Sequence, residues 1–262
     1  MADLLVNLAA SAGTVFVLLA AVFALSTRRD RHDLIDTAWG LGFAAIAAIT
    51  YVLSAGKGDP TTRVLVTGLT VLWGVRLAIH IGLRNHGKPE DRRYVEIRSR
   101  GGALRLARVV YLTQGAVMLL VSLPVQAAQY DTGPPAWLLG LGAAVWLTGF
   151  TFETVGDWQL RRFTADPANR GRVLDRGLWR YTRHPNYFGD ATIWWGLYLL
   201  ACGTWMGAAT LPAPILMTYL LAKGTGKPLT EKHLTTTRPG YADYVRRTSG
   251  FIPLPPKQDK PA

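Results

Sequence analysis

Long apolar runs constrain the fold of this chain more than any other feature. Its 262 residues are 49% hydrophobic, and the hydrophobic residues gather in segments of roughly 17–25 residues, the length of helix that crosses a hydrocarbon core. Seven spans are expected, at residues 4–25, 34–54, 64–83, 107–127, 136–158, 188–203 and 205–222. We therefore predict an all-α integral membrane protein with a single bundle over 1–254 and a disordered cytoplasmic tail over 255–262.

The basic residues predict the orientation of these spans. Three, eight, seven and eight lysines and arginines lie in the successive stretches on one side, 26–33, 84–108, 160–186 and 223–262. The loops on the other side hold only Lys57 and Arg63. Because cytoplasmic loops carry an excess of basic residues, we expect the N-terminus outside and the C-terminus in the cytoplasm. The same asymmetry accounts for the net charge of +12 through membrane topology, without nucleic acid as a partner.

Several familiar catalytic arrangements are missing from the sequence. The single cysteine, Cys202, excludes a disulfide framework or a cysteine-based metal site, and the five histidines show no HExxH spacing. Neither a GxSxG nucleophile elbow nor a GxGxxG turn after a strand occurs. We therefore expect no metal centre, no acyl-enzyme chemistry and no Rossmann domain.

Two polar clusters lie at the inner ends of the second and third spans. Asp33 is placed to cap the start of a helix, whereas Asp36 lies deeper, where a carboxylate usually faces a cavity or a partner. Arg76, His80 and Arg84 are four residues apart and share one face of the third span. We expect that face to line a cavity, because snorkelling to the interface suits Arg84 well but Arg76 poorly.

Two further polar clusters follow along the chain. Glu153 and Asp157 project from one face at the inner end of the fifth span, where they form either a site or ion pairs with Arg161. The strip 177–190 combines arginines, a histidine, an asparagine and tyrosines at the entrance to an apolar helix, which favours an anionic ligand over a simple basic loop. The charged run 90–94 is equally explained as a solvated, internally paired segment.

These motifs carry a resemblance to a known family. Glu153-x-x-x-Asp157-x-Gln159, followed by Gly177-Leu-Trp-Arg-Tyr-x-Arg-His-Pro-Asn-Tyr-Phe-Gly189, resembles the steroid 5α-reductase superfamily, in particular its bacterial branch. The inner loop Asn85-His-Gly-Lys88 and the terminal Tyr241-x-x-Tyr244 segment also fit that branch. Sterol reductases and isoprenylcysteine-type methyltransferases share the Arg-His-Pro-Asn-Tyr strip, so the strip indicates the superfamily and not the reaction.

The resemblance implies a bundle of a bacterial inner membrane that binds NADPH from the cytoplasmic side and takes a hydrophobic substrate from the bilayer. It implies cofactor contacts at Asn85, Lys88, Glu153, Asp157, Arg161, Arg183, His184, Asn186, Tyr187, Asp190, His233, Tyr241 and Arg247. The reaction implied is the reduction of an activated C=C bond in a steroid-like or other lipid.

The proton donor for such a reduction is less readily assigned. The superfamily uses an adjacent Gln-Glu pair in the second span and a tyrosine in the third, and neither is recognisable here. Asp36 is the only carboxylate at a comparable place, so Asp36 and Tyr94 are the first candidates, with His80 third.

Two other classes of function remain open. A lipid or prenyl methyltransferase that uses S-adenosylmethionine requires an acidic pair after the last span, but Glu231 is followed by Lys232 and His233. The many basic residues also suit a phosphorylated cofactor better than a sulfonium. A non-catalytic lipid-binding membrane protein is the third class, and it predicts no cofactor binding.

Overall fold

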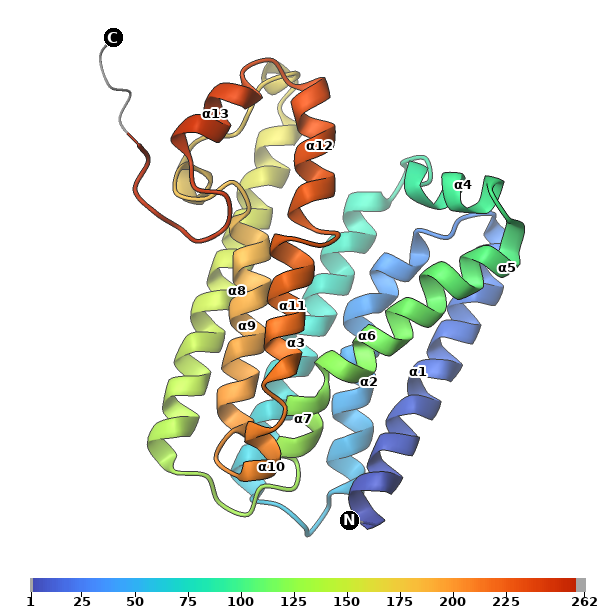
Figure 1. Ribbon diagram of the computed structural model, residues 1–262, viewed down its shortest axis with the longest axis vertical. Helices are drawn as coiled ribbons and strands as arrows, with labels where there is room; N and C mark the ends of the chain where they lie inside the picture. Colours follow the sequence, from blue (N-terminus) through green and yellow to red (C-terminus); the bar gives the residue numbers. More distant parts are fainter. Residues whose placement is uncertain (1, 258–262) are drawn as a thin grey trace. The chain divides into compact units, whose positions relative to one another are not determined.

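The computed structural model describes residues 2–257, and the regular structure in this range is helical, with a single isolated bridge between Thr182 and Ser249 in place of strands (Figure 1). The longer helices are α1 (Ala2–Arg29), α2 (Leu34–Leu53), α3 (Pro60–Asn85), α8 (Ala136–Ala165), α9 (Pro185–Ala201), α11 (Pro212–Ala222) and α12 (Lys227–Thr237). The shorter ones are α4 (Arg92–Ser99), α5 (Gly102–Leu106), α6 (Thr113–Val121), α7 (Leu123–Ala128), α10 (Trp205–Ala208) and α13 (Tyr241–Arg247). A π-helix, Ala107–Leu112, joins α5 to α6. The predicted all-α class is confirmed for the described residues.

Six stretches are long and apolar enough to cross a membrane, which supports the predicted membrane protein. They are α1, α2, α3, Gly102–Val121, α8 and Trp205–Thr237, the last of which comprises α10, α11 and α12. The remaining predicted span corresponds to α9, which has 17 residues and is therefore about 25 Å long, somewhat less than a typical hydrocarbon core. A seventh crossing and the orientation stay predictions.

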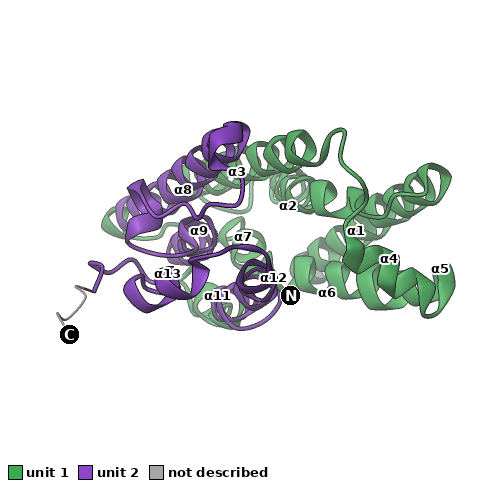
Figure 2. Ribbon diagram, turned by 90° about the horizontal axis from the view of Figure 1, so that it is seen from above, with its two compact units in different colours: residues 1–139, 200–213 green, residues 140–199, 214–262 purple. Residues whose placement is uncertain are grey.

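The chain divides into two compact units, coloured separately in Figure 2. Unit 1 consists of Met1–Leu139 and Leu200–Ala213, and unit 2 of Gly140–Leu199 and Pro214–Ala262. The predicted tail begins at 255, but the backbone is still held at Lys257, whose N–H donates to the Arg247 carbonyl at 2.9 Å. The rest of that tail, 258–262, lies outside the described residues.

Within unit 1, α2 and α3 pack through two glycines. A Cβ atom on Gly40 would lie 2.2 Å from the Gly74 carbonyl oxygen, and one on Gly74 would lie 2.3 Å from the Gly40 carbonyl oxygen. Small residues allow two helix backbones to approach this closely in a membrane, where packing replaces the hydrophobic effect as the driving force. The contact lies one helical turn after Asp36, so it fixes the position of that residue relative to α3.

Within unit 2, α8 and α9 pack in the same way. A Cβ atom on Gly149 would lie 2.6 Å from the Gly189 carbonyl oxygen, and one on Gly189 would lie 2.4 Å from the Glu153 backbone nitrogen. Further along, a Cβ atom on Gly196 would lie 2.6 Å from the backbone nitrogen of Trp146. This seam holds the C-terminal half of α8 directly against α9.

Helix α3 begins four residues before the predicted span. Asp59 caps it by accepting a hydrogen bond from the Thr62 N–H at 2.7 Å, and Pro60 occupies the first turn, where a missing N–H has no effect. Arg63 was expected in an outer loop, but it lies inside α3 and is only 8% exposed. Its guanidinium donates to the Ser54 hydroxyl at 2.8 Å and to the Tyr51 carbonyl at 2.6 Å.

The expected cap of α2 also differs in detail. Asp33 does occupy the N-cap position, but its side chain makes no capping hydrogen bond. Instead the carboxylate pairs with Arg31 at 2.8 Å. The residue has helical dihedral angles, so its side chain is directed away from the first free N–H groups of the helix.

The glycine contact between α2 and α3 leads to a matched test. Gly74→Ala should destabilise the protein by about 1–3 kcal/mol, because the added methyl group has no space beside the Gly40 carbonyl. Gly68→Ala on the same helix has nothing within 4 Å of the new atom and should be neutral or stabilising by up to ~1 kcal/mol. Equilibrium unfolding in mixed micelles measures both, and equal stabilities of the two variants would contradict the packing.

Candidate functional site

A carboxylate and a tyrosine meet in unit 1, where α2 begins. The Tyr94 hydroxyl donates to Asp36 Oδ1 at 2.6 Å, and the Arg93 guanidinium lies 3.6 Å from Asp36 Oδ2. We call Asp36, Asp91, Arg93 and Tyr94 the Asp36 cluster. Tyr94 is 5% exposed. Burial, reinforced by the nearby Asp36 carboxylate, raises the pKa of Tyr94 well above its ordinary value, so the hydroxyl keeps its proton at neutral pH.

Short helix α4 presents these side chains to α2. Asp91 caps α4 by accepting from the Arg93 N–H at 2.9 Å, and the same carboxylate pairs with the Arg93 guanidinium at 2.9 Å. Arg93 thus lies between two carboxylates and offsets part of their negative charge. The charged run 90–94 was explained equally well as a solvated segment, but the structure engages it with α2.

A second set of polar contacts joins the same segments. The Glu90 carboxylate accepts from the His32 backbone N–H at 2.6 Å and pairs with Arg98 at 3.2 Å. The imidazole of His32 is buried and lies 3.1 Å from the Tyr111 hydroxyl. Tyr111 belongs to the π-helix, an element that occurs frequently at functional sites. These contacts hold α4 and the connection between α1 and α2 in place.

The polar residues predicted on one face of α3 differ in their exposure to solvent. Arg76 and His80 are half-buried on α3, whereas Arg84 is exposed and donates to the Asn85 side-chain oxygen at 3.2 Å. Lys88 is exposed in the loop that follows. The expected cofactor contacts of Asn85 and Lys88 and the catalytic role of His80 stay predictions.

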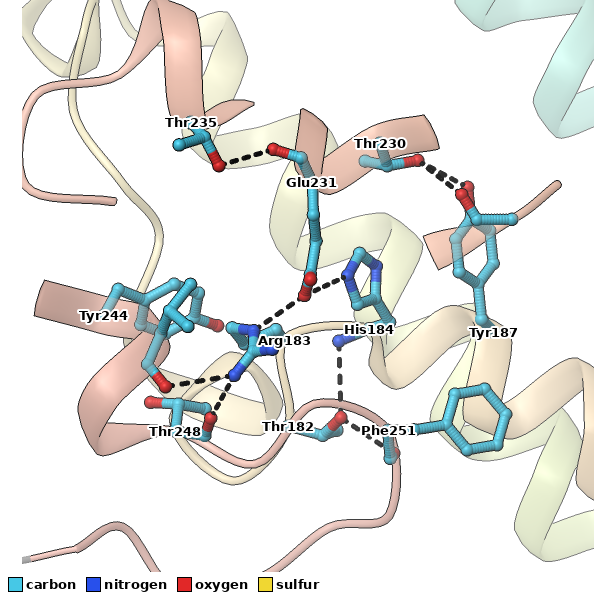
Figure 3. A network of polar contacts seen from close by, with 12 residues as sticks. Thr182, Arg183, His184, Tyr187, Thr230, Glu231, Thr235, Tyr244, Thr248 and Phe251 are labelled. Atoms are coloured by element: carbon cyan, nitrogen blue, oxygen red, sulfur yellow. Dashed lines mark hydrogen bonds and ion pairs between the residues drawn. The ribbon is translucent and has the colours of Figure 1, made fainter. Parts of the chain in front are cut away.

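In unit 2 a single carboxylate bridges the Arg183-His184 strip to α12, as Figure 3 shows. Glu231 Oε1 lies 2.7 Å from Arg183 Nε and 3.1 Å from His184 Nε2. We call Arg183, His184 and Glu231 the Glu231 network. Both basic side chains are buried, at 8% and 2% exposure. Burial lowers the pKa of His184 despite the opposing effect of Glu231, which favours a neutral imidazole.

The C-terminal segment is tied to this network through its backbone. The Arg183 guanidinium donates to the carbonyls of Thr248 at 2.5 Å and Val245 at 3.1 Å, while its backbone N–H donates to Ser249 at 2.9 Å. The Thr182 hydroxyl donates to the Phe251 carbonyl at 2.8 Å (Figure 3). Arg183 therefore anchors the end of the chain, a role that uses up most of its donors.

The predicted carboxylate pair lies where α8 meets α9. Glu153 and Asp157 are 3% and 6% exposed, and Asp157 accepts from the Asn186 amide at 3.1 Å. Asp190, at 8% exposure, follows on α9. Gln159 accepts from the Leu178 N–H at 3.0 Å and so fixes the approach of the loop that contains the strip. The structure thus brings Asp157 and Asn186 together, and their expected cofactor contacts stay predictions.

The remaining predicted residues fall into two groups. The Tyr187 ring stacks on His184 with centroids 5.3 Å apart, and its hydroxyl lies 3.2 Å from that of Thr230. Tyr241 is buried, and this burial raises its pKa to about 12. By contrast, the side chains of Arg161 and His233 are exposed, and Arg247 pairs with Asp243 at 2.9 Å.

Glu231 is the main residue that sequence reasoning missed. It was set aside because no second acidic residue follows it, yet it is the acceptor that both Arg183 and His184 use. A signal was present in principle: a buried Arg-His pair requires a carboxylate, and few occur in the basic C-terminal segment. Glu90 and Tyr111 carried no comparable signal.

The Glu231 network yields a direct test of its structural role. Glu231→Gln leaves the buried Arg183 charge without its counterion. We expect the free energy of unfolding to fall by more than the ~1 kcal/mol that an exposed ion pair contributes. The loss should be at most the ~3–5 kcal/mol that follows when a fully buried pair is broken. The C-terminal segment should then be cleaved faster by protease. Asp243→Asn, which removes exposed pairs with Arg246 and Arg247, is the control and should cost less than ~1 kcal/mol. If protease cleaved the two variants at the same rate, the anchoring of the C-terminal segment by the Glu231 network would be contradicted.

Comparison with known proteins identifies a family whose match covers most of the chain. The family described as "protein of unknown function (DUF1295)" matches residues 22–248. The match includes both the Asp36 cluster and the Glu231 network. No curated protein and no solved structure matches the chain. With most of its length matched, the chain belongs to the DUF1295 family of proteins.

Proposed function

We propose that this protein is a membrane oxidoreductase that reduces an activated C=C bond of a hydrophobic substrate with NADPH. The observation that carries the proposal is the hydrogen bond of 2.6 Å between Tyr94 and Asp36. The resemblance of the Glu153–Gln159 and Gly177–Gly189 motifs to the steroid 5α-reductase superfamily supports the same class of reaction.

The Asp36 cluster has the chemistry that such a reduction needs. Hydride addition to a carbon conjugated with a carbonyl places negative charge on the carbonyl oxygen, and a proton completes the product. In the structure Tyr94 donates its one hydroxyl proton to Asp36; in the reaction this hydroxyl turns from Asp36 to protonate the substrate, and water reprotonates Tyr94 afterwards. Arg93 compensates the negative charge of Asp36. The pair takes the place of the second-span carboxylate and third-span tyrosine of the superfamily, although here the tyrosine follows the third span.

The residues of unit 2 fit a dinucleotide cofactor. Asp157 and Asn186 supply an acceptor and a donor suited to ribose hydroxyls or a carboxamide. A Cβ atom on Gly250 would lie 2.6 Å from Lys227 Nζ, so an ammonium group lies close to bare backbone. Such a region suits phosphate groups. NADPH, when bound, supplies the hydride.

The position of the Asp36 cluster beside an apolar helix indicates the class of substrate. The Asp36 cluster lies at the end of α2, one of the six helices apolar enough to span a bilayer. A lipid with a conjugated carbonyl reaches such a site without passing through water. We propose a steroid-like or prenyl enone.

The proton donor is tested by two conservative substitutions. Tyr94→Phe and Asp36→Asn should each lower NADPH-dependent reduction of an enone lipid by about 10²-fold or more, the usual contribution of a positioned acid. NADPH affinity should not change, because neither residue is among the predicted cofactor contacts. Oxidation of NADPH is followed by absorbance with a 3-oxo-4-ene steroid and a prenyl enone as trial substrates. Tyr130→Phe, outside the cluster, is the control, and wild-type turnover by Tyr94→Phe would rule out this donor.

The proposed orientation is tested by cysteine labelling. Lys57→Cys and Lys88→Cys, each in a Cys202→Ser background, place one exposed thiol on each side of the predicted topology. We expect an impermeant maleimide to label Lys57→Cys in intact cells and Lys88→Cys only after permeabilisation, because the basic loops face the cytoplasm. The reverse pattern would place the proposed cofactor site outside.

A further inference from the structure

The stretch Gly102–Val121, one of the six that are apolar enough to cross a membrane, carries two arginines near its start. It consists of α5, the π-helix and α6 (Figure 1). Arg105 and Arg108 follow Gly102 by three and six residues, which is about 5 and 9 Å along a helix. Neither belongs to the Asp36 cluster or to the predicted cofactor contacts. A guanidinium group at this depth is costly unless it reaches an anion or water.

Both arginines lie on the exposed face of this stretch. Leu104, Val109 and Leu112 share that face and are between 48% and 66% exposed, whereas Leu106 and Val110 are buried. The exposed positions recur every four residues, as expected for one side of a helix whose other side packs in the core. In a membrane protein an exposed apolar face of this kind contacts lipid chains.

The side chain of Arg105 runs back toward the start of the stretch. A Cβ atom on Gly101 would lie 2.9 Å from Arg105 Cδ, so the aliphatic part of the arginine covers the residue that precedes the helix. Arginines near the end of a membrane span extend in this way to bring the charge to the headgroup region while the stem stays on apolar surface. The direction of the side chain thus indicates phosphate groups of lipid as its surroundings.

The protein itself offers these two arginines no counterion. The carboxylates that precede the stretch pair with other arginines: Glu90 with Arg98 at 3.2 Å, Asp91 with Arg93 at 2.9 Å, and Glu96 with Arg100 at 3.7 Å. Among residues 2–257, neither arginine of the exposed face forms an ion pair or a side-chain hydrogen bond. Their charge is therefore available to a ligand outside the chain.

We propose that Arg105 and Arg108 bind the phosphate of an anionic phospholipid, whose acyl chains lie along the exposed apolar face. Residues three apart on a helix are close enough to share one headgroup, and guanidinium groups donate paired hydrogen bonds to phosphate. A zwitterionic lipid presents the same phosphate together with its own cation, so a headgroup with net negative charge is favoured. The inference is independent of the proposed reduction, because it involves none of the residues assigned to that reaction.

Native mass spectrometry of the purified full-length chain in detergent micelles tests the proposal. Phosphatidylglycerol and phosphatidylcholine are titrated separately, and wild type should bind phosphatidylglycerol more tightly. We expect Arg105→Ala and Arg108→Ala each to weaken phosphatidylglycerol binding about 5-fold, the effect of one basic residue near an anionic surface, and the double variant about 25-fold. Binding of phosphatidylcholine should change much less.

Arg100→Ala is the matched control, because it removes the same charge from an exposed position nearby that already pairs with Glu96. Its affinity for phosphatidylglycerol should equal that of wild type. Circular dichroism and monodispersity confirm that each variant is folded. Unchanged phosphatidylglycerol binding in the double variant, or an equal loss in Arg100→Ala, would overturn the proposal. Excess inorganic phosphate should not displace the lipid, and displacement would show a site for free anions instead.

Discussion

A polar group without a partner costs several kcal/mol in hydrocarbon, and this constraint organises the whole chain. Several deep polar side chains occur in sets that hydrogen-bond to one another. Gln126, at 1% exposure, accepts from Asn7 and Ser11, each at 3.0 Å. Two sets of charged residues satisfy one another in the same way, where Asp36 near the start of α2 meets Tyr94 and where Glu231 on α12 meets Arg183. The constraint thus explains why these charged side chains occur in partnered sets.

In each unit a glycine seam lies next to the polar cluster. Gly40 follows Asp36 by one helical turn, and Gly149 precedes Glu153 by one turn. Close approach of the two backbones fixes the distance between side chains on facing helices, so the position of Asp157 against Asn186 follows from the seam between α8 and α9. Packing of the two helices and the geometry of the polar side chains beside them are therefore linked.

The sequence predicted the features that depend on local pattern. Apolar runs located the helices, and the i, i+4 spacing placed Glu153 and Asp157 on one face, both buried. Asp36 and Tyr94 were each selected as candidates, but their contact joins residues 58 positions apart, and no local pattern predicts it. Glu231 was missed for the same reason, since its partners lie 47 and 48 positions away. The π-helix has an ordinary apolar sequence, and Arg63 was assigned to a loop because the Asp59 cap was not recognised.

The central claim is that the protein binds NADPH, and direct titration of the wild-type chain in nanodiscs tests it most simply. Nine tryptophans make energy transfer to the reduced nicotinamide a sensitive measure of binding. The account predicts saturable transfer with one NADPH per chain, reversed by NADP⁺ and unaffected by S-adenosylmethionine. Absence of saturable transfer, or displacement of NADPH by S-adenosylmethionine, would contradict it.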